Sequence, residues 1–197
     1  MSSIEKLPRK RMSREDRRRQ LLDVAWQLLR QEGSDALSLG RLAEQAGVTK
    51  PVVYDHFETR LGLLAALYGE YDTRQTAMLE VALATCQATL ESRAGVIAEA
   101  YVDCVMTQGR ELPGLTAALE GSPEMEALKR AYEDVFLAKC REALRPFSAS
   151  GTISVAGLRL LMGAVECLSQ AAAMGELTPQ QAKDELRATI VAMVERQ

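Results

Sequence analysis

Aromatic residues and histidine are scarce in this chain of 197 residues, which contains three Phe, five Tyr, one Trp and one His. The core must therefore be built mainly from Leu, Ala, Val and Met, which suit packed helices better than sheets. No segment alternates between apolar and polar residues with the period of two that a half-buried strand requires. Composition and patterning together predict an all-α protein.

The sequence also lacks the motifs of common catalytic and metal sites. It has no G-x-S-x-G nucleophile motif, no glycine-rich phosphate loop and no H-E-x-x-H motif. Its only histidine, His56, has no histidine partner, and the four cysteines are far apart with no C-x-x-C pair. We therefore expect no metal, no cofactor and no enzymatic activity, and we expect reduced thiols. The cysteines are Cys86, Cys104, Cys140 and Cys167.

Long apolar runs are missing as well. The longest uncharged run, residues 146–158, has thirteen residues and includes Ser, Thr and Gly. The first twenty residues contain no apolar stretch of the signal-peptide type. We therefore expect no membrane-spanning segment and a cytoplasmic location.

Positive charge is concentrated at the N-terminus, although the net charge of the chain is −3. Residues 1–20 hold eight Lys or Arg against three acids, whereas residues 61–197 hold twelve against eighteen. Such asymmetry indicates either a basic arm that meets an anionic partner or a solvated basic tail.

Turn and capping residues divide the chain into helices. Ser13 precedes an acidic first turn that ends at Asp16, and Thr178 precedes Pro179 with Gln181 in the position of a capping box. These signals and the apolar spacing predict helices near residues 13–33, 38–47, 49–56, 59–85, 92–108, 115–120, 123–145, 153–174 and 179–195.

Residues 38–57 are the most informative segment. Ala43 is small enough to let two helices approach, and Gly47 can adopt the left-handed conformation that ends the first of them. Val48 then fills the corner, and Thr49 is placed to cap the second helix. This pattern is typical of a helix-turn-helix.

The stretch from Gln20 to about Leu67 resembles the DNA-binding domain of the tetracycline-repressor (TetR) family. The resemblance rests on residues 21–25, Gly33, residues 38–43, residues 46–50, residues 53–57, Arg60 and residues 63–64. Two positions depart from the family pattern: Arg60 replaces a more common Lys, and Gly62 replaces a common acid. Gly62 is expected to loosen the start of the fourth helix, since glycine costs about 0.8–1 kcal/mol relative to alanine.

The resemblance implies a fold and a set of DNA contacts. An N-terminal three-helix helix-turn-helix DNA-binding domain with a basic arm (residues 1–60) is joined to a C-terminal helical effector-binding and dimerisation domain (residues 61–197). The expected base-reading residues are Thr49, Lys50, Pro51 and Val52. The expected phosphate contacts are Ser38, Tyr54, His56 and Arg60, with Arg9, Lys10, Arg11 and Arg14 reaching neighbouring phosphates or the minor groove. Alternatively, Lys50 touches only phosphate, His56 braces the helix and Tyr54 packs in the core.

The C-terminal helices carry aromatic, Met and Cys side chains that either line a cavity for a small, largely apolar effector or simply form core. They are Tyr68, Tyr71, Met78, Tyr101, Cys104, Tyr132, Phe136 and Met162. Glu166 interrupts an apolar helix, either as a buried acid that recognises a cationic ligand or as part of a polar stripe.

The resemblance also implies a homodimer built on the last two helices. The interface residues we expect are Val155, Leu158, Leu161, Met162, Val165, Leu168, Leu186, Ile190 and Val194. The predicted function is a ligand-responsive repressor that binds a pseudo-palindromic double-stranded DNA operator and is released by a small molecule. The alternatives are a DNA-binding regulator without an effector, a helical enzyme and a protein–protein adaptor.

Overall fold

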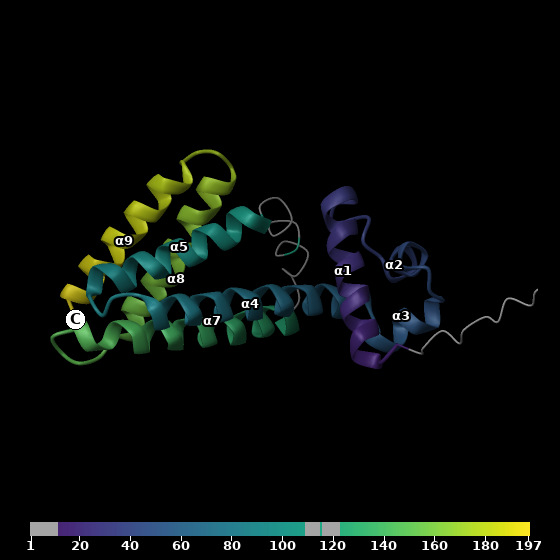
Figure 1. The fold of residues 1–197 in the computed structure, drawn as a ribbon, viewed down its shortest axis with the longest axis horizontal. Helices are drawn as coiled ribbons and strands as arrows, with labels where there is room; N and C mark the ends of the chain where they lie inside the picture. Colours follow the sequence, from purple (N-terminus) through teal and green to yellow (C-terminus); the bar gives the residue numbers. More distant parts are fainter. Residues whose placement is uncertain (1–11, 109–114, 116–122) are drawn as a thin grey trace, which may run out of the picture. The chain divides into compact units, whose positions relative to one another are not determined.

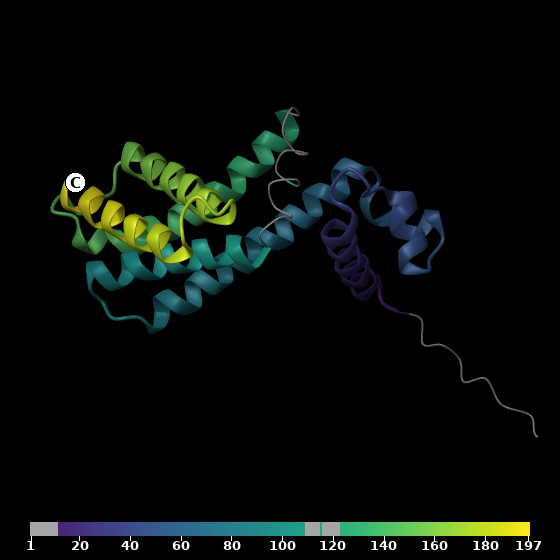
Figure 2. The same ribbon diagram turned by 90° about the horizontal axis from the view of Figure 1, so that it is seen from above.

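The computed structural model describes residues 12–108, 115 and 123–197, and every regular element within these residues is helical (Figures 1 and 2). The predicted all-α fold class is confirmed. The chain divides into two compact units, one that ends at Leu63 and one that runs from Leu64 to Gln197. The predicted basic arm at Arg9, Lys10 and Arg11, and residues 116–120 of one predicted helix, lie outside the described residues.

The first unit contains α1 (Arg14–Glu32), α2 (Leu39–Ala46), α3 (Lys50–Phe57) and the first turn of α4 (Arg60–Thr85). Helix α1 begins where predicted, because the hydroxyl of Ser13 accepts a hydrogen bond from the backbone N–H of Asp16 at 3.0 Å. Helix α2 packs against both α1 and α3. The fully buried side chains that hold the three helices together include Leu21, Ala25, Leu42 and Val53.

The second unit contains the rest of α4, α5 (Leu90–Gln108), α7 (Pro123–Leu144), a short 3₁₀ helix η1 (Arg145–Phe147), α8 (Val155–Ala173) and α9 (Pro179–Glu195). Helices α5, α8 and α9 pack on one another, and α7 packs on α5 and α8 (Figure 2). The capping box predicted at the start of α9 is confirmed, since Thr178 and Gln181 exchange side-chain-to-backbone hydrogen bonds.

Most of the side chains predicted to form the dimer interface lie in the core of the second unit instead. Their exposed fractions are 7% or less, and they belong to one cluster with buried residues of α4, α5 and α7. The buried residues are Leu158, Leu161, Met162, Val165, Leu186, Ile190 and Val194. Of the remaining two, Val155 is 71% exposed and Leu168 is half-buried. The apolar stripe that we assigned to a partner subunit is therefore used to pack the protomer itself.

Helix α8 is long and apolar enough, by length and composition alone, to cross a membrane, and 39% of its apolar stretch is buried inside the protein. One such helix is weak evidence for a membrane span, because core helices of soluble proteins pass the same test. Its buried side chains, such as Leu161 and Val165, contribute to the core of the second unit. Its surface nevertheless includes a large apolar side chain, since Leu160 is 47% exposed.

Candidate DNA-binding surface

The turn between α2 and α3 has the geometry of a helix-turn-helix. Ser38 caps α2, since its hydroxyl accepts a hydrogen bond from the N–H of Arg41 at 3.1 Å. Gly47 ends α2 with φ of 64°, in the left-handed region that glycine adopts without steric cost. The next N–H, that of Val48, donates to the carbonyl of Ala43 at 3.0 Å. These bonds direct the chain into α3.

An ion pair fixes α2 against α1. The guanidinium of Arg41 donates to both carboxylate oxygens of Glu32, at 2.6 and 3.1 Å. This hydrogen bonding lowers the pKa of Glu32 and raises the pKa of Arg41. Bidentate pairs of this kind restrict the relative orientation of the two side chains, which helps to hold the turn that presents α3.

The start of α3 is exposed, as a base-reading segment requires. Thr49, Lys50 and Pro51 are exposed and Val52 is half-buried. Thr49 occupies the N-cap position, but its hydroxyl makes no capping hydrogen bond, so the prediction that it caps α3 through its side chain was wrong. The Lys50 side chain lies beside the first turn of α2: a Cβ atom added to Gly40 would be 3.7 Å from its Cε. This position leaves Lys50 as a candidate for phosphate as well as for base contact.

Arg60, predicted to bind phosphate, braces the loop between α1 and α2. Its Nε donates to the carbonyl of Leu37 at 2.8 Å, and one terminal nitrogen donates to the carbonyl of Ser34 at 2.7 Å. Both carbonyls lie just before Ser38, the cap of α2. These bonds give Arg60 a bracing role at the start of α2, and its contact with phosphate stays a prediction.

An open basic pocket of about 380 Å³ lies beside α3 and is lined by Arg14, Glu15, Arg18 and His56. Arg14 donates to the carbonyl of Asp55 at 3.3 Å, which holds its guanidinium at the rim. The two arginines are four residues apart on α1 and therefore lie on one face of that helix. Sequence reasoning placed Arg14 in a basic arm and missed Arg18, although this spacing was available as a signal.

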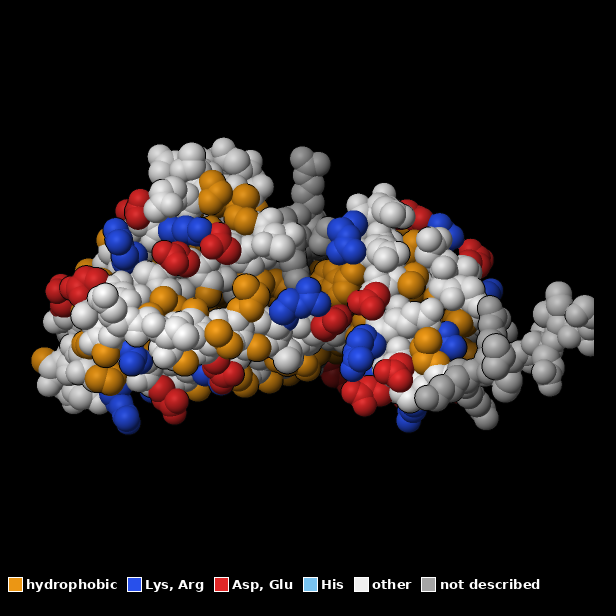
Figure 3. Space-filling view, viewed as in Figure 1, with side chains coloured by type: hydrophobic (Ala, Val, Ile, Leu, Met, Phe, Trp, Pro, Cys, Tyr) orange, Lys and Arg blue, Asp and Glu red, His pale blue; other side chains and the backbone are white. Residues whose placement is uncertain are grey.

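The half-buried imidazole of His56 lies within this positive environment. Burial lowers the pKa of His56 below its ordinary value of 6.5, and the charges of Arg14 and Arg18 lower it further. An anion in the pocket would offset the effect of the two arginines on the pKa of His56. Tyr54, on the same helix, is 51% exposed rather than packed in the core, and Ser38 is also exposed. Lys, Arg, Asp and Glu side chains are interspersed on the visible face of this unit (Figure 3).

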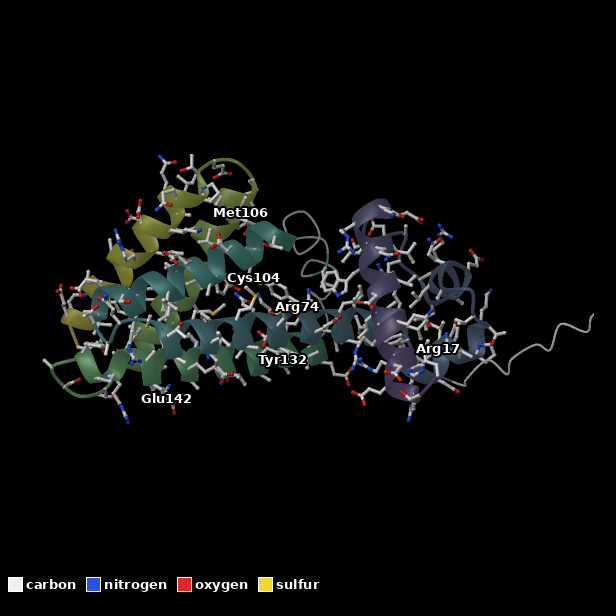
Figure 4. All side chains as sticks on the ribbon, viewed as in Figure 1. Arg17, Arg74, Cys104, Met106, Tyr132 and Glu142 are labelled. Atoms are coloured by element: carbon white, nitrogen blue, oxygen red, sulfur yellow. The ribbon has the colours of Figure 1, made fainter. Side chains whose placement is uncertain are left out.

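The second unit contains the side chains that were predicted to line a ligand pocket, among them Cys104 on α5 and Tyr132 on α7 (Figure 4). The ring centroids of Tyr68 and Tyr132 are 5.8 Å apart, and those of Tyr101 and Phe136 are 5.4 Å apart. Tyr71, Cys104 and Met162 are also buried. Met78 is 52% exposed, so its assignment to an interior pocket was wrong. Sequence reasoning also missed buried polar side chains on α4, of which Asp72 is one.

Comparison with known proteins places the helix-turn-helix in a family. Residues 21–67, which include α2, α3 and the hydrophobic face of α1, match the family model described as bacterial regulatory proteins, tetR family. The first unit therefore carries the DNA-binding domain of the TetR family of transcriptional regulators. The protein is similar to the HTH-type transcriptional activator FasR of Mycolicibacterium smegmatis, with 34% identity over 96 residues. That match covers 48% of this chain and 43% of FasR, so the chain spans less than half of this curated relative.

Solved structures extend the similarity of fold to the rest of the chain. A protein of unknown function from Rhodococcus sp. RHA1 has 26% identity and a TM-score of 0.73, covering 95% of this chain and 98% of that one. FadR from Bacillus subtilis, solved in complex with stearoyl-CoA, has 16% identity and a TM-score of 0.74, covering 90% and 99%. The relatives are named as regulators, in agreement with the expectation that the chain is not an enzyme.

Proposed function

We propose that this TetR-family regulator is a ligand-responsive repressor that binds a pseudo-palindromic operator as a homodimer and is released by a small molecule. The observation that carries the DNA-binding role is the pairing, in one unit, of an exposed α3 start with the basic pocket formed by Arg14, Arg18 and His56. The start of α3 contacts the base edges, and the basic pocket holds a backbone phosphate. Its DNA partner implies a location in the cytoplasm.

The direct test is selection of bound duplexes from a random DNA pool. A two-fold dimer should select a pseudo-palindrome with half-site centres about 34–36 Å apart or somewhat more. Lys50→Ala should relax the preference at one base position per half-site, whereas Tyr54→Phe should weaken binding to all duplexes alike. Selection of no preferred sequence would contradict the proposal. If Lys50→Ala loses affinity equally for the selected duplex and for random DNA, Lys50 contacts phosphate rather than a base.

The dimer is proposed to use the outer face of α8 and α9, in place of the core residues named from the sequence. On α8 this face carries Leu160, Gly163, Cys167 and Met174 just past its end, all exposed. Leu160 is 47% exposed and Met174 is 60% exposed. Such an apolar strip is costly in water, and a second copy of the same helix would cover it in an isologous contact.

The effector is proposed to bind among α4, α5, α7 and α8, where the tyrosines gather. The stearoyl-CoA complex of Bacillus subtilis FadR shows that a regulator of this fold binds a small molecule, which supports an effector role without identifying the ligand or its site in this chain. FasR is named as an activator, which makes activation the second candidate. A reporter gene placed behind the selected operator separates the two, because a repressor lowers expression and an activator raises it.

A further inference from the structure

Helix α4 carries buried polar groups without partners. The side chains of Asp72, Gln75 and Thr76 are 9%, 4% and 8% exposed. Within the described part of the chain, Gln75 Nε2 and Thr76 Oγ1 have no hydrogen-bond partner. No ion pair or hydrogen bond of Asp72 is found among the same residues. Buried polar groups are nearly always satisfied in folded proteins, so two unpaired atoms on adjacent residues, one turn after Asp72, indicate a missing partner.

Aromatic rings surround this stripe. Tyr68 precedes Asp72 by four residues and Tyr71 precedes Gln75 by four, about one helical turn in each case, and the centroids of the two tyrosine rings are 6.3 Å apart. From α7, the ring of Tyr132 approaches Tyr68 at 5.8 Å, and its hydroxyl lies so close to α4 that a Cβ atom on Gly69 would be 2.4 Å away. The faces of such rings carry partial negative charge and attract cations.

The charges around the stripe are negative in excess. Glu133, whose side chain is 12% exposed, and Glu166 share the ammonium of Lys129 at 3.6 and 3.1 Å. Arg159 adds a second cation near Glu133 at 3.8 Å. The Glu166 contact supports the polar-stripe interpretation of that residue. These pairs leave Asp72 as the carboxylate that no cation balances.

The protonation of Asp72 reflects this isolation. Burial raises the pKa of Asp72 to about 6, and the negative charge of Glu133 adds to the effect. A cation beside the carboxylate would act in the opposite direction and lower its pKa. The charged and titratable groups in this cluster are Tyr68, Tyr71 and Arg74 on α4, Tyr101 and Cys104 on α5, Lys129, Tyr132 and Glu133 on α7, and Arg159 and Glu166 on α8.

We propose that the effector of this regulator is an organic amine, whose ammonium group pairs with Asp72 while its apolar or aromatic body packs against the surrounding tyrosines. Gln75 donates from its amide to an acceptor on the same molecule. The described residues place no three His, Cys, Asp or Glu side chains in an arrangement that could hold a metal ion, which favours an organic cation. This inference rests on the proposed effector role and names the chemical class of the ligand.

Three probes that share one body and differ in head group test the inference: 4-phenylbutylamine, 4-phenylbutan-1-ol and 4-phenylbutanoate. Binding is measured by calorimetry on the full chain without DNA. We expect the amine to bind, and Asp72→Asn to weaken it by about tenfold to a hundredfold, the value of a charge-assisted hydrogen bond in a buried site. Glu99→Gln, which removes an exposed carboxylate of α5, is the matched control and should leave the affinity unchanged.

The pH dependence gives a second readout that needs no variant. The amine stays protonated, whereas Asp72 takes up a proton as the pH falls below about 6, so amine affinity should be constant above that pH and decline below it. Binding of the alcohol or the acid as tightly as the amine, or an amine affinity that Asp72→Asn leaves intact, would overturn the inference. Absence of binding by the amine would do the same. None of these results touches operator binding, which duplex selection tests separately.

Discussion

A Cβ atom on residue 62 would lie 2.3 Å from the carbonyl oxygen of Phe57, so the turn between α3 and α4 leaves no room for a side chain at Gly62. The same turn holds Glu58 at a φ of 57°, unusual for a residue other than glycine. Thr59 caps α4 by accepting a hydrogen bond from the N–H of Gly62 at 3.0 Å. The close approach of this carbonyl explains sterically why this chain has glycine at position 62, where the family pattern commonly has an acid.

Gly62→Ala should therefore destabilise the protein, by about 1–3 kcal/mol, although alanine is the better helix former. The clash involves a backbone carbonyl, which cannot move without shifting α3 against α4. Denaturant unfolding of the full chain measures the change. Gly95→Ala on α5 is the control, because an added Cβ there would make an ordinary contact of 3.7 Å with Arg187. Equal stabilisation by both substitutions would show that the turn has more room than the structure indicates.

Arg60→Ala should weaken DNA binding through the shape of the first unit rather than through a lost phosphate contact. Removal of its bonds to the carbonyls of Leu37 and Ser34 frees the loop before α2. We expect lower thermal stability and weaker binding with an unchanged dependence of affinity on salt. A true phosphate ligand would reduce the slope of log affinity against log salt by about 0.9. Such a reduction for Arg60→Ala would restore the role expected from the sequence.

DNA binding should tighten as the pH falls. In the free protein, burial and the charges of Arg14 and Arg18 hold the pKa of His56 below 6.5. A phosphate in the basic pocket favours the protonated imidazole and raises that pKa, so binding takes up a proton. The DNA affinity rises as the pH falls through the pKa that His56 has in the DNA complex. It becomes constant again below the pKa that His56 has in the free protein.

Operator affinity measured across this range at constant salt tests the assignment. Besides the two arginines, the charges of Arg17 and Asp55 influence the pKa of His56. His56→Gln should flatten the profile, whereas Tyr54→Phe should lower affinity at every pH and keep its shape. A profile that persists in His56→Gln would place the titrating group elsewhere.

Leu160→Glu should yield monomers while the fold is retained. Leu160 is 47% exposed on the outer face of α8, whereas its neighbour Leu161 is 1% exposed in the core. Light scattering and circular dichroism on the two variants separate the faces: Leu161→Glu should unfold the second unit, and Leu160→Glu should only dissociate the dimer. A Leu160→Glu variant that remains dimeric would exclude this part of α8 from the interface.

Local chemistry explains what the sequence determined by itself. The caps at Ser13, Ser38 and Thr178 and the left-handed turn at Gly47 depend on groups three or four residues apart, so their bonds follow from the order of residues. The helix-turn-helix is also determined locally, because the residues that define it, including Ala43 and Gly47, lie within residues 38–57.

Only the tertiary structure decided which partner each face and each charge meets. Periodicity showed that Leu161 and Ile190 lie on apolar faces, but packing of α8 and α9 against α5 buries them within the protomer and leaves Leu160 outside. Arg60 was recognisable as a basic residue, yet its carbonyl partners are more than twenty residues away. Asp72 is an ordinary acid in the sequence. It becomes a buried carboxyl beside Glu133 only in the folded second unit, because burial and pairing depend on neighbours distant along the chain.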